Sequence, residues 1–197
     1  MGFLTEYRQD SIWYGGKEYL LDLAYDSVLN VQRLFKDEML SDLDHIEGAL
    51  EIFCRNKTGH LKPAQKAELL TEIITQHIHI KKRRPIHSIE RRAFDFELDG
   101  EYIYASFMQA YGIDLIDQQG KLSWRKFIAL FEGLPSDTKI KEIMRIRLSD
   151  PPVPNQENWK ECRQFSELQS YYQLPVEGGG GQNGLYRLFT ALEAQAG

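Results

Sequence analysis

The stretch that decides the fold is DGEYIYASFMQAYGIDL at residues 99–115, which is followed by LSWRKFIALFEGL at residues 122–134. In both pieces apolar residues recur at intervals of three or four, which is the spacing of one face of an α-helix. We therefore expect helices over residues 99–111 and 123–133. The apolar faces consist of Tyr104, Phe107, Met108 and Tyr111 in the first helix, and of Trp124, Phe127, Ile128 and Phe131 in the second.

Working outward, the same spacing predicts helices over five further segments: 22–36, 41–56, 63–80, 137–148 and 155–172. Ser41 is the expected N-cap of the second of these, with Asp44 three residues later, and Pro63 suits a first helical position. Residues 11–21 differ, because two glycines lie between two aromatic and aliphatic runs, which is typical of a β-hairpin. The predicted fold class is mainly α, a multi-helix bundle with one N-terminal β-hairpin.

The pattern breaks at residues 81–97, where a basic run ends in Pro85. Residues 81–92 hold six basic residues and one acid, a local +5 that leaves −10 for the rest of a chain of net charge −5. We interpret 81–97 as a basic connector between two helical halves of a body over residues 1–150. Residues 151–197 form a C-terminal extension: a Pro-rich spacer, a helix, the Gly178–Gly181 hinge, and a last amphipathic helix.

Composition excludes several classes of protein. The chain has 197 residues, of which 42% are hydrophobic and 27% charged, so neither disorder nor a disulfide scaffold is expected. No apolar run approaches the length of a membrane-spanning helix, and the N-terminus lacks the pattern of a secretory signal. Cys54 and Cys162 match no metal or redox spacing and are expected as thiols in a reducing cytoplasm.

No motif predicts catalysis, a metal or a cofactor. The segment from Asp95 to Gly100 resembles the start of a calcium loop, but Ser106 occupies the position of its bidentate Glu, so we expect Asp99 to N-cap the next helix instead. His77 and His79 point to opposite sides of a helix. The glycine run lacks the Lys and Ser or Thr of a phosphate loop. We predict that the chain is not an enzyme.

The basic connector leaves three alternatives open. Its cations could bind nucleic acid phosphates, dock an acidic protein partner, or belong to a solvated linker. No aromatic residues are interleaved for base stacking, so nucleic acid is the least favoured partner. The residues concerned are Lys81, Lys82, Arg83, Arg84, Arg91 and Arg92.

Residues 94–148 resemble a small phage family, the bacteriophage gene-product-fifteen proteins. Three groups of residues carry the resemblance: Phe107–Leu115; Leu122-Ser123-Trp124 with Phe127, Leu130 and Leu134; and Ile143, Ile146 and Arg147. The hairpin matches more weakly. With it, the resemblance covers residues 11–150. It implies a gene in the tail module of phages and prophages of Gram-positive bacteria. The implied function is a tail assembly chaperone in the host cytoplasm that binds the tape-measure protein, the major tail protein or both, with no catalytic residues to carry over.

Two alternatives remain beside the chaperone: a structural tail component incorporated into the virion, and a nucleic-acid-binding protein that uses residues 81–92. For a chaperone, the candidate partner surface consists of Tyr111, Trp124, Phe127 and Phe131, although core packing of these aromatic side chains is the favoured interpretation. The last helix is the other candidate, for partner binding or self-association. Its apolar residues are Leu185, Leu188, Phe189 and Leu192.

Overall fold

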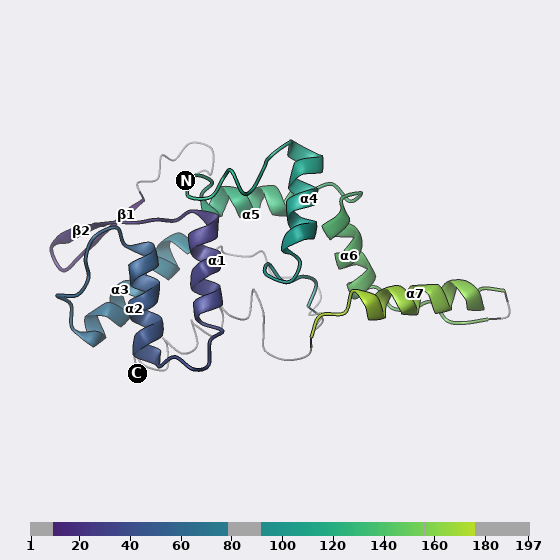
Figure 1. Ribbon diagram of the computed structural model, residues 1–197, viewed down its shortest axis with the longest axis horizontal. Coiled ribbons are helices and arrows are strands. Elements are labelled where there is room, and N and C mark those ends of the chain that lie inside the picture. Colours follow the sequence, from purple (N-terminus) through teal and green to yellow (C-terminus); the bar gives the residue numbers. More distant parts are fainter. Residues whose placement is uncertain (1–9, 79–91, 156, 176–197) are drawn as a thin grey trace. The chain divides into compact units, whose positions relative to one another are not determined.

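The computed structural model describes residues 10–78, 92–155 and 157–175. These residues form seven α-helices, one π-helical turn and one two-stranded sheet, so the predicted mainly α fold with an N-terminal hairpin is confirmed (Figure 1). The chain divides into two compact units. In the described residues, unit 1 comprises 10–78 and 119–127, and unit 2 comprises 92–118 and 128–175 without residue 156. The predicted division near residue 150 stays a prediction.

Unit 1 begins with the hairpin of β1 (Ser11–Tyr14) and β2 (Lys17–Leu20). Gly15 and Gly16 both have positive φ, 57° and 78°, which is why glycine occupies both positions of this two-residue turn. One face of the hairpin is buried through Ile12 and Tyr19. The other face leaves Trp13 and Leu20 exposed.

Three helices and the π-helical turn complete most of unit 1. Ser41 and Asp44 form the expected capping box at the start of the second helix, and Pro63 is the first residue of the third. The predicted helix over 63–80 is α-helical only as far as Ile73 and continues as a π turn. The elements are α1 (Tyr25–Leu34), α2 (Asp42–Phe53), α3 (Pro63–Ile73) and η1 (Ile74–Ile78).

Residues 119–127 return to unit 1 from far along the chain. The N–H of Tyr25 donates to the carbonyl of Leu122 at 2.9 Å, and the N–H of Trp124 donates to the carbonyl of Leu23 at 2.8 Å. The rings of Tyr25 and Phe127 stack with centroids 4.8 Å apart. The first turn of α5 (Trp124–Glu132) therefore belongs to the core of unit 1.

Unit 2 contains α4 (Gly100–Tyr111), the rest of α5, α6 (Lys139–Leu148) and α7 (Trp159–Tyr171). The predicted helices over 99–111, 123–133 and 137–148 are confirmed within two residues at each end. Ser106 joins α4 to α6, because its hydroxyl accepts from the N–H of Ile140 at 3.0 Å. Phe94, Phe96 and Phe131 form an aromatic cluster with centroid distances of 4.8–5.4 Å.

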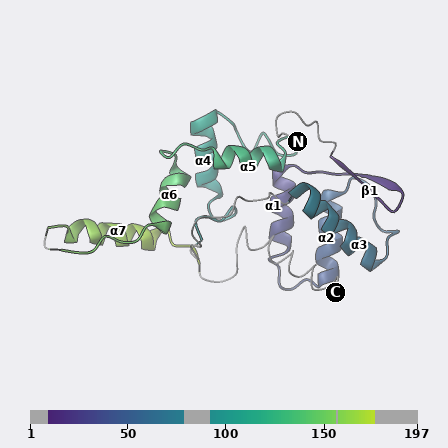
Figure 2. The same cartoon turned by 180° about the vertical axis from the view of Figure 1, so that it is seen from behind.

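Within unit 2, α7 extends away from α4 and α6 in both views (Figures 1 and 2). Among the described residues, no helix combines the length and the apolar character that crossing a membrane requires.

Candidate functional site

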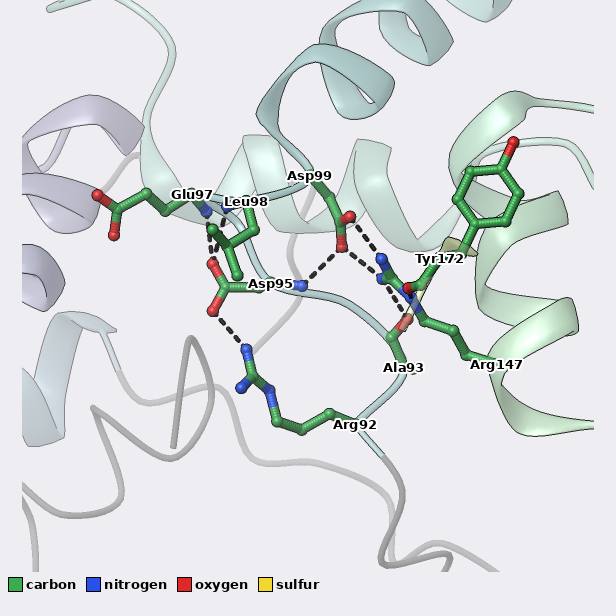
Figure 3. A network of polar contacts seen from close by, with 8 residues as sticks. All are labelled: Arg92, Ala93, Asp95, Glu97, Leu98, Asp99, Arg147 and Tyr172. Carbon is green, nitrogen blue, oxygen red and sulfur yellow. Dashed lines mark hydrogen bonds and ion pairs between the residues drawn. The ribbon is translucent and has the colours of Figure 1, made fainter. Parts of the chain in front are cut away.

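The centre of unit 2 is a buried ion pair between Arg147 of α6 and Asp99, the residue before α4 (Figure 3). Two guanidinium nitrogens, Nη1 and Nη2, donate to the two carboxylate oxygens at 2.6 and 2.8 Å. The side chains are only 8% and 2% exposed. Nη1 also donates to the carbonyl of Ala93, and Nε to the carbonyl of Tyr172 at 2.6 Å. One guanidinium thus holds together the loop before α4, α6 and the end of α7.

The loop before α4 is itself organised by Asp95. The Asp95 carboxylate accepts from the backbone N–H groups of Glu97 and Leu98 and from the guanidinium of Arg92, while its own N–H donates to Asp99 (Figure 3). Asp99 does occupy the N-cap position, but its side chain makes no capping hydrogen bond. The prediction that the Asp99 side chain caps the helix is therefore wrong. The carboxylate accepts two charged hydrogen bonds from the guanidinium of Arg147, and these are stronger than one hydrogen bond from a neutral N–H.

Beyond α6 the chain forms a projection that we call the arm, residues 149–175. Its first part runs out along the face of α7, and α7 then runs back toward α6 (Figures 1 and 2). Within the arm, the Cys162 thiol contacts the carbonyl of Pro152 at 3.5 Å and the Asn158 amide donates to the carbonyl of Val153 at 3.1 Å. The predicted helix over 155–172 begins four residues late, because Asn155 and Asn158 form a turn of side-chain-to-backbone hydrogen bonds there.

The arm is fastened to the rest of unit 2 at the last turns of α7. The Gln169 amide donates to the carbonyls of Ile146 and Ser149, at 2.9 and 2.7 Å, and so satisfies carbonyls that the end of α6 leaves without helical partners. Lys139 lies 5.1 Å from the centroid of the Tyr172 ring. Hydrogen bonding to the Tyr172 side chain, followed by hydrogen bonding to Glu142, raises the pKa of Lys139.

Most of the α7 surface is left open. Cys162 is its one buried residue, and the partly buried seam continues through Phe165, Gln169 and Tyr172. At 100° per residue, Trp159 lies about 100° to one side of this seam and Leu168 about 80° to the other. These two side chains are 51% and 44% exposed, and Tyr171 is 75% exposed. The exposed aromatic and aliphatic side chains of α7 therefore lie on both sides of the seam and do not form one continuous stripe.

The candidate residues of the basic connector are mostly outside the described residues. Of them only Arg92 is described, and its guanidinium is paired with Asp95 at 2.6 Å. Leu185, Leu188, Phe189 and Leu192 also lie outside the described residues. Their roles stay predictions.

The aromatic candidates are placed by the structure. Trp124, Phe127 and Phe131 are buried, as the favoured core interpretation has it. Tyr111 is partly exposed, but its hydroxyl donates to the carbonyl of Leu130 at 3.0 Å and so helps to satisfy the end of α5. The monomer does not present these four side chains together as a surface.

The exposed side chains of the arm are functional candidates that sequence reasoning missed. The signal was present, because the apolar residues of α7 drift around the helix instead of forming one stripe. A drifting pattern means that one packing partner cannot cover all of them. In the described residues, no group of three or more histidine, cysteine or acidic side chains is placed to hold a metal ion.

Comparison with known protein families gives a match over most of the chain. The family model described as "Bacteriophage Gp15 protein" matches residues 8–174, which is most of the chain and includes the hairpin, the Arg147 network and nearly all of the arm. Neither the curated proteins nor the solved structures contain a match. The chain therefore belongs to the bacteriophage Gp15 protein family.

Proposed function

We propose that the protein acts in phage tail morphogenesis as a non-enzymatic assembly chaperone, and that its arm binds helical segments of the tape-measure protein. Membership of a phage family supports the phage context. The observation that carries the proposal is the set of exposed apolar side chains on α7: Trp159, Leu168 and Tyr171. A chaperone for a long helical protein must cover apolar helix faces until assembly, and α7 offers exposed apolar side chains to such faces on both of its sides.

The distribution of charge on the arm favours apolar recognition. Its ionic side chains are of both signs, and Arg163 pairs with Glu167 at 2.9 Å on its surface. Binding through the arm is therefore expected to depend weakly on salt, whereas binding through the basic connector would weaken steeply as salt is raised. Measuring complex formation at 50 and 500 mM salt, values that span the range in which exposed charges become screened, separates the two modes.

The direct test is co-expression with the tape-measure protein of the same phage. The wild-type chain should increase the soluble fraction of that protein. Replacing Trp159, Leu168 and Tyr171 together by glutamine should abolish the effect. The matched control replaces Gln164 and Ser170, exposed polar residues of the same helix, by alanine and should leave the effect intact. Equal solubility with and without the wild-type chain contradicts the proposal.

Location distinguishes the chaperone from the structural alternative. A chaperone acts in the host cytoplasm and is released, so mass spectrometry of purified tails should not detect it. A constant copy number in purified tails would instead assign the protein to the virion. In that case the arm would be a permanent contact of the tail.

A further inference from the structure

The outer edge of the hairpin offers a second interface, independent of the arm. In an antiparallel pair, residues alternate between those whose backbone groups bond across the pair and those whose groups point outward. The N–H of Leu21 donates to the carbonyl of Asp10 at 2.7 Å, which fixes this alternation. With Ile12 opposite Tyr19 and Trp13 opposite Glu18, the backbone groups of Ser11 and Trp13 point away from β2.

The opposite edge confirms this alternation. Leu20 is the cross-strand partner of Ser11, and its outward groups are occupied. Its N–H donates to the Asn56 side chain at 2.6 Å, and its carbonyl accepts from the N–H of Arg55 at 2.9 Å. On the β1 edge, by contrast, no described residue forms a hydrogen bond with Ser11 or Trp13 from outside the hairpin.

Exposed strand edges are normally protected by a charge, a proline, a bulge or a covering segment. β1 reads Ser-Ile-Trp-Tyr and contains no charge and no proline, and its register with β2 is continuous, without a bulge. Trp13 is 69% exposed on the outer face of the hairpin. An edge that none of the described residues covers, beside an exposed tryptophan, is suited to pairing with another strand.

We propose that the occupant of this edge is β1 of a second copy of the chain, paired antiparallel about Ile12 to give a four-stranded sheet across a two-fold axis. In this register Ser11 of each copy faces Trp13 of the other. The two Trp13 side chains are then diagonal neighbours about 7–8 Å apart on the exposed face, within reach of aromatic contact.

The charges around the edge favour self-pairing in this register. The strand itself is neutral, so two copies bring no like charges into contact. Asp10 of one copy faces Tyr14 of the other, and the two Asp10 side chains lie four residues apart along the strands, about 13 Å. That separation exceeds the screening length of about 8 Å at physiological salt. Parallel pairing in register would place the two acids side by side.

The first test is the mass of the full chain in solution. An interface of only four main-chain hydrogen bonds and one aromatic contact is small, so the dimer is expected to be weak and to form at high protein concentration. Light scattering after gel filtration should therefore show the mass rising with concentration from 22.9 kDa toward twice that value. Trp13→Lys should raise the dissociation constant by at least about tenfold, because it places two cations across the edge. Leu20→Lys, on the same face but on the occupied edge, should leave the dimer intact.

A wild-type chain that stays at 22.9 kDa up to about 500 µM overturns the proposal, since even a weak dimer of this kind would be populated there. So does a dimer that survives Trp13→Lys. If circular dichroism shows that Trp13→Lys is misfolded, Ser11→Lys on the same edge replaces it. The arm plays no part in these measurements, so their outcome is separate from that of the co-expression test.

The second test reads the register. Ser11→Cys protein mixed with Trp13→Cys protein should form a disulfide-linked pair, because these positions face each other at a distance that a disulfide spans. The wild-type chain, whose Cys54 and Cys162 are buried, serves as the control for background crosslinking. Cross-linking of Ser11→Cys with itself at an equal rate would contradict the register about Ile12.

Discussion

Replacing Arg147 by methionine tests whether the buried ion pair organises unit 2. The change removes both hydrogen bonds to Asp99 and those to the carbonyls of Ala93 and Tyr172. It leaves a carboxylate that is 2% exposed, whose remaining hydrogen bond among the described residues is the one from the N–H of Asp95. Removing one partner of a buried pair costs about 3–5 kcal/mol, because the other charge stays desolvated and unpaired. Arg147→Lys should recover only part of this, since an ammonium cannot reproduce the planar fork.

Hydrogen exchange read by mass spectrometry suits this prediction, because it reports on each helix separately. Some amides of α4 and α6 exchange only when unit 2 opens. If the free energy of that opening falls by about 3–5 kcal/mol, these amides should exchange faster by about 100-fold or more. Arg145→Met is the matched control, since Arg145 is an exposed arginine of the same helix. The double variant Asp99→Asn/Arg147→Met should be less destabilised than Arg147→Met alone. Exchange in α6 within threefold of wild type, a change of about 0.7 kcal/mol or less, would refute the assigned role.

Three further predictions concern unit 1. A Cβ on Gly48 would lie 2.8 Å from a methyl of Leu34, which is too close for an ordinary contact. Alanine is favoured over glycine inside a helix by about 1 kcal/mol, and Gly48→Ala should therefore raise the free energy of unfolding by less than this amount. In the Leu34→Ala background the full gain should appear in urea unfolding, and additive effects would contradict the contact. Burial raises the pKa of the Cys54 thiol to about 11. Iodoacetamide at pH 8.5 should therefore modify Cys54 about 100-fold more slowly than it modifies a free cysteine, because only the thiolate reacts. In urea, where the chain is unfolded, Cys54 and a free cysteine should react at the same rate. Burial and the hydrogen bond to Glu68 raise the pKa of Tyr14 from 10.0 to about 12, so the stability that this residue contributes is complete below pH 10 and is lost between pH 10 and 12. The difference in melting temperature between wild type and Tyr14→Phe should shrink over that range, and a constant difference would argue against the assignment.

Local rules predicted the elements well where the chemistry is local. The glycine pair of the hairpin, the Ser41–Asp44 capping box and Pro63 at a helix start each depend on residues within a few positions of one another. The same rules gave Asp99 the wrong partner, because Arg147 is 48 residues away and no local pattern indicates that the two meet. Long-range charge pairing overrode a local capping preference.

The candidate surface shows a similar limit. Periodicity places Trp124, Phe127 and Phe131 on one face of a helix, but a face that packs inward and a face that binds a partner have the same sequence pattern. Burial distinguishes them, and it assigns these three to the core. In α7 the pattern was less regular, and that irregularity marked side chains that the folded chain leaves exposed: Trp159, Leu168 and Tyr171.

The return of residues 119–127 to unit 1 has a consequence for synthesis of the protein. Unit 1 needs Trp124 and Phe127 to complete its core, yet the ribosome makes α4 of unit 2 before it reaches them. The 47 residues between positions 80 and 127 take about 2–10 s to translate at roughly 5–20 residues per second. During that interval the nascent chain holds an incomplete first unit, so a fragment that stops at residue 80 should behave as an unfinished domain.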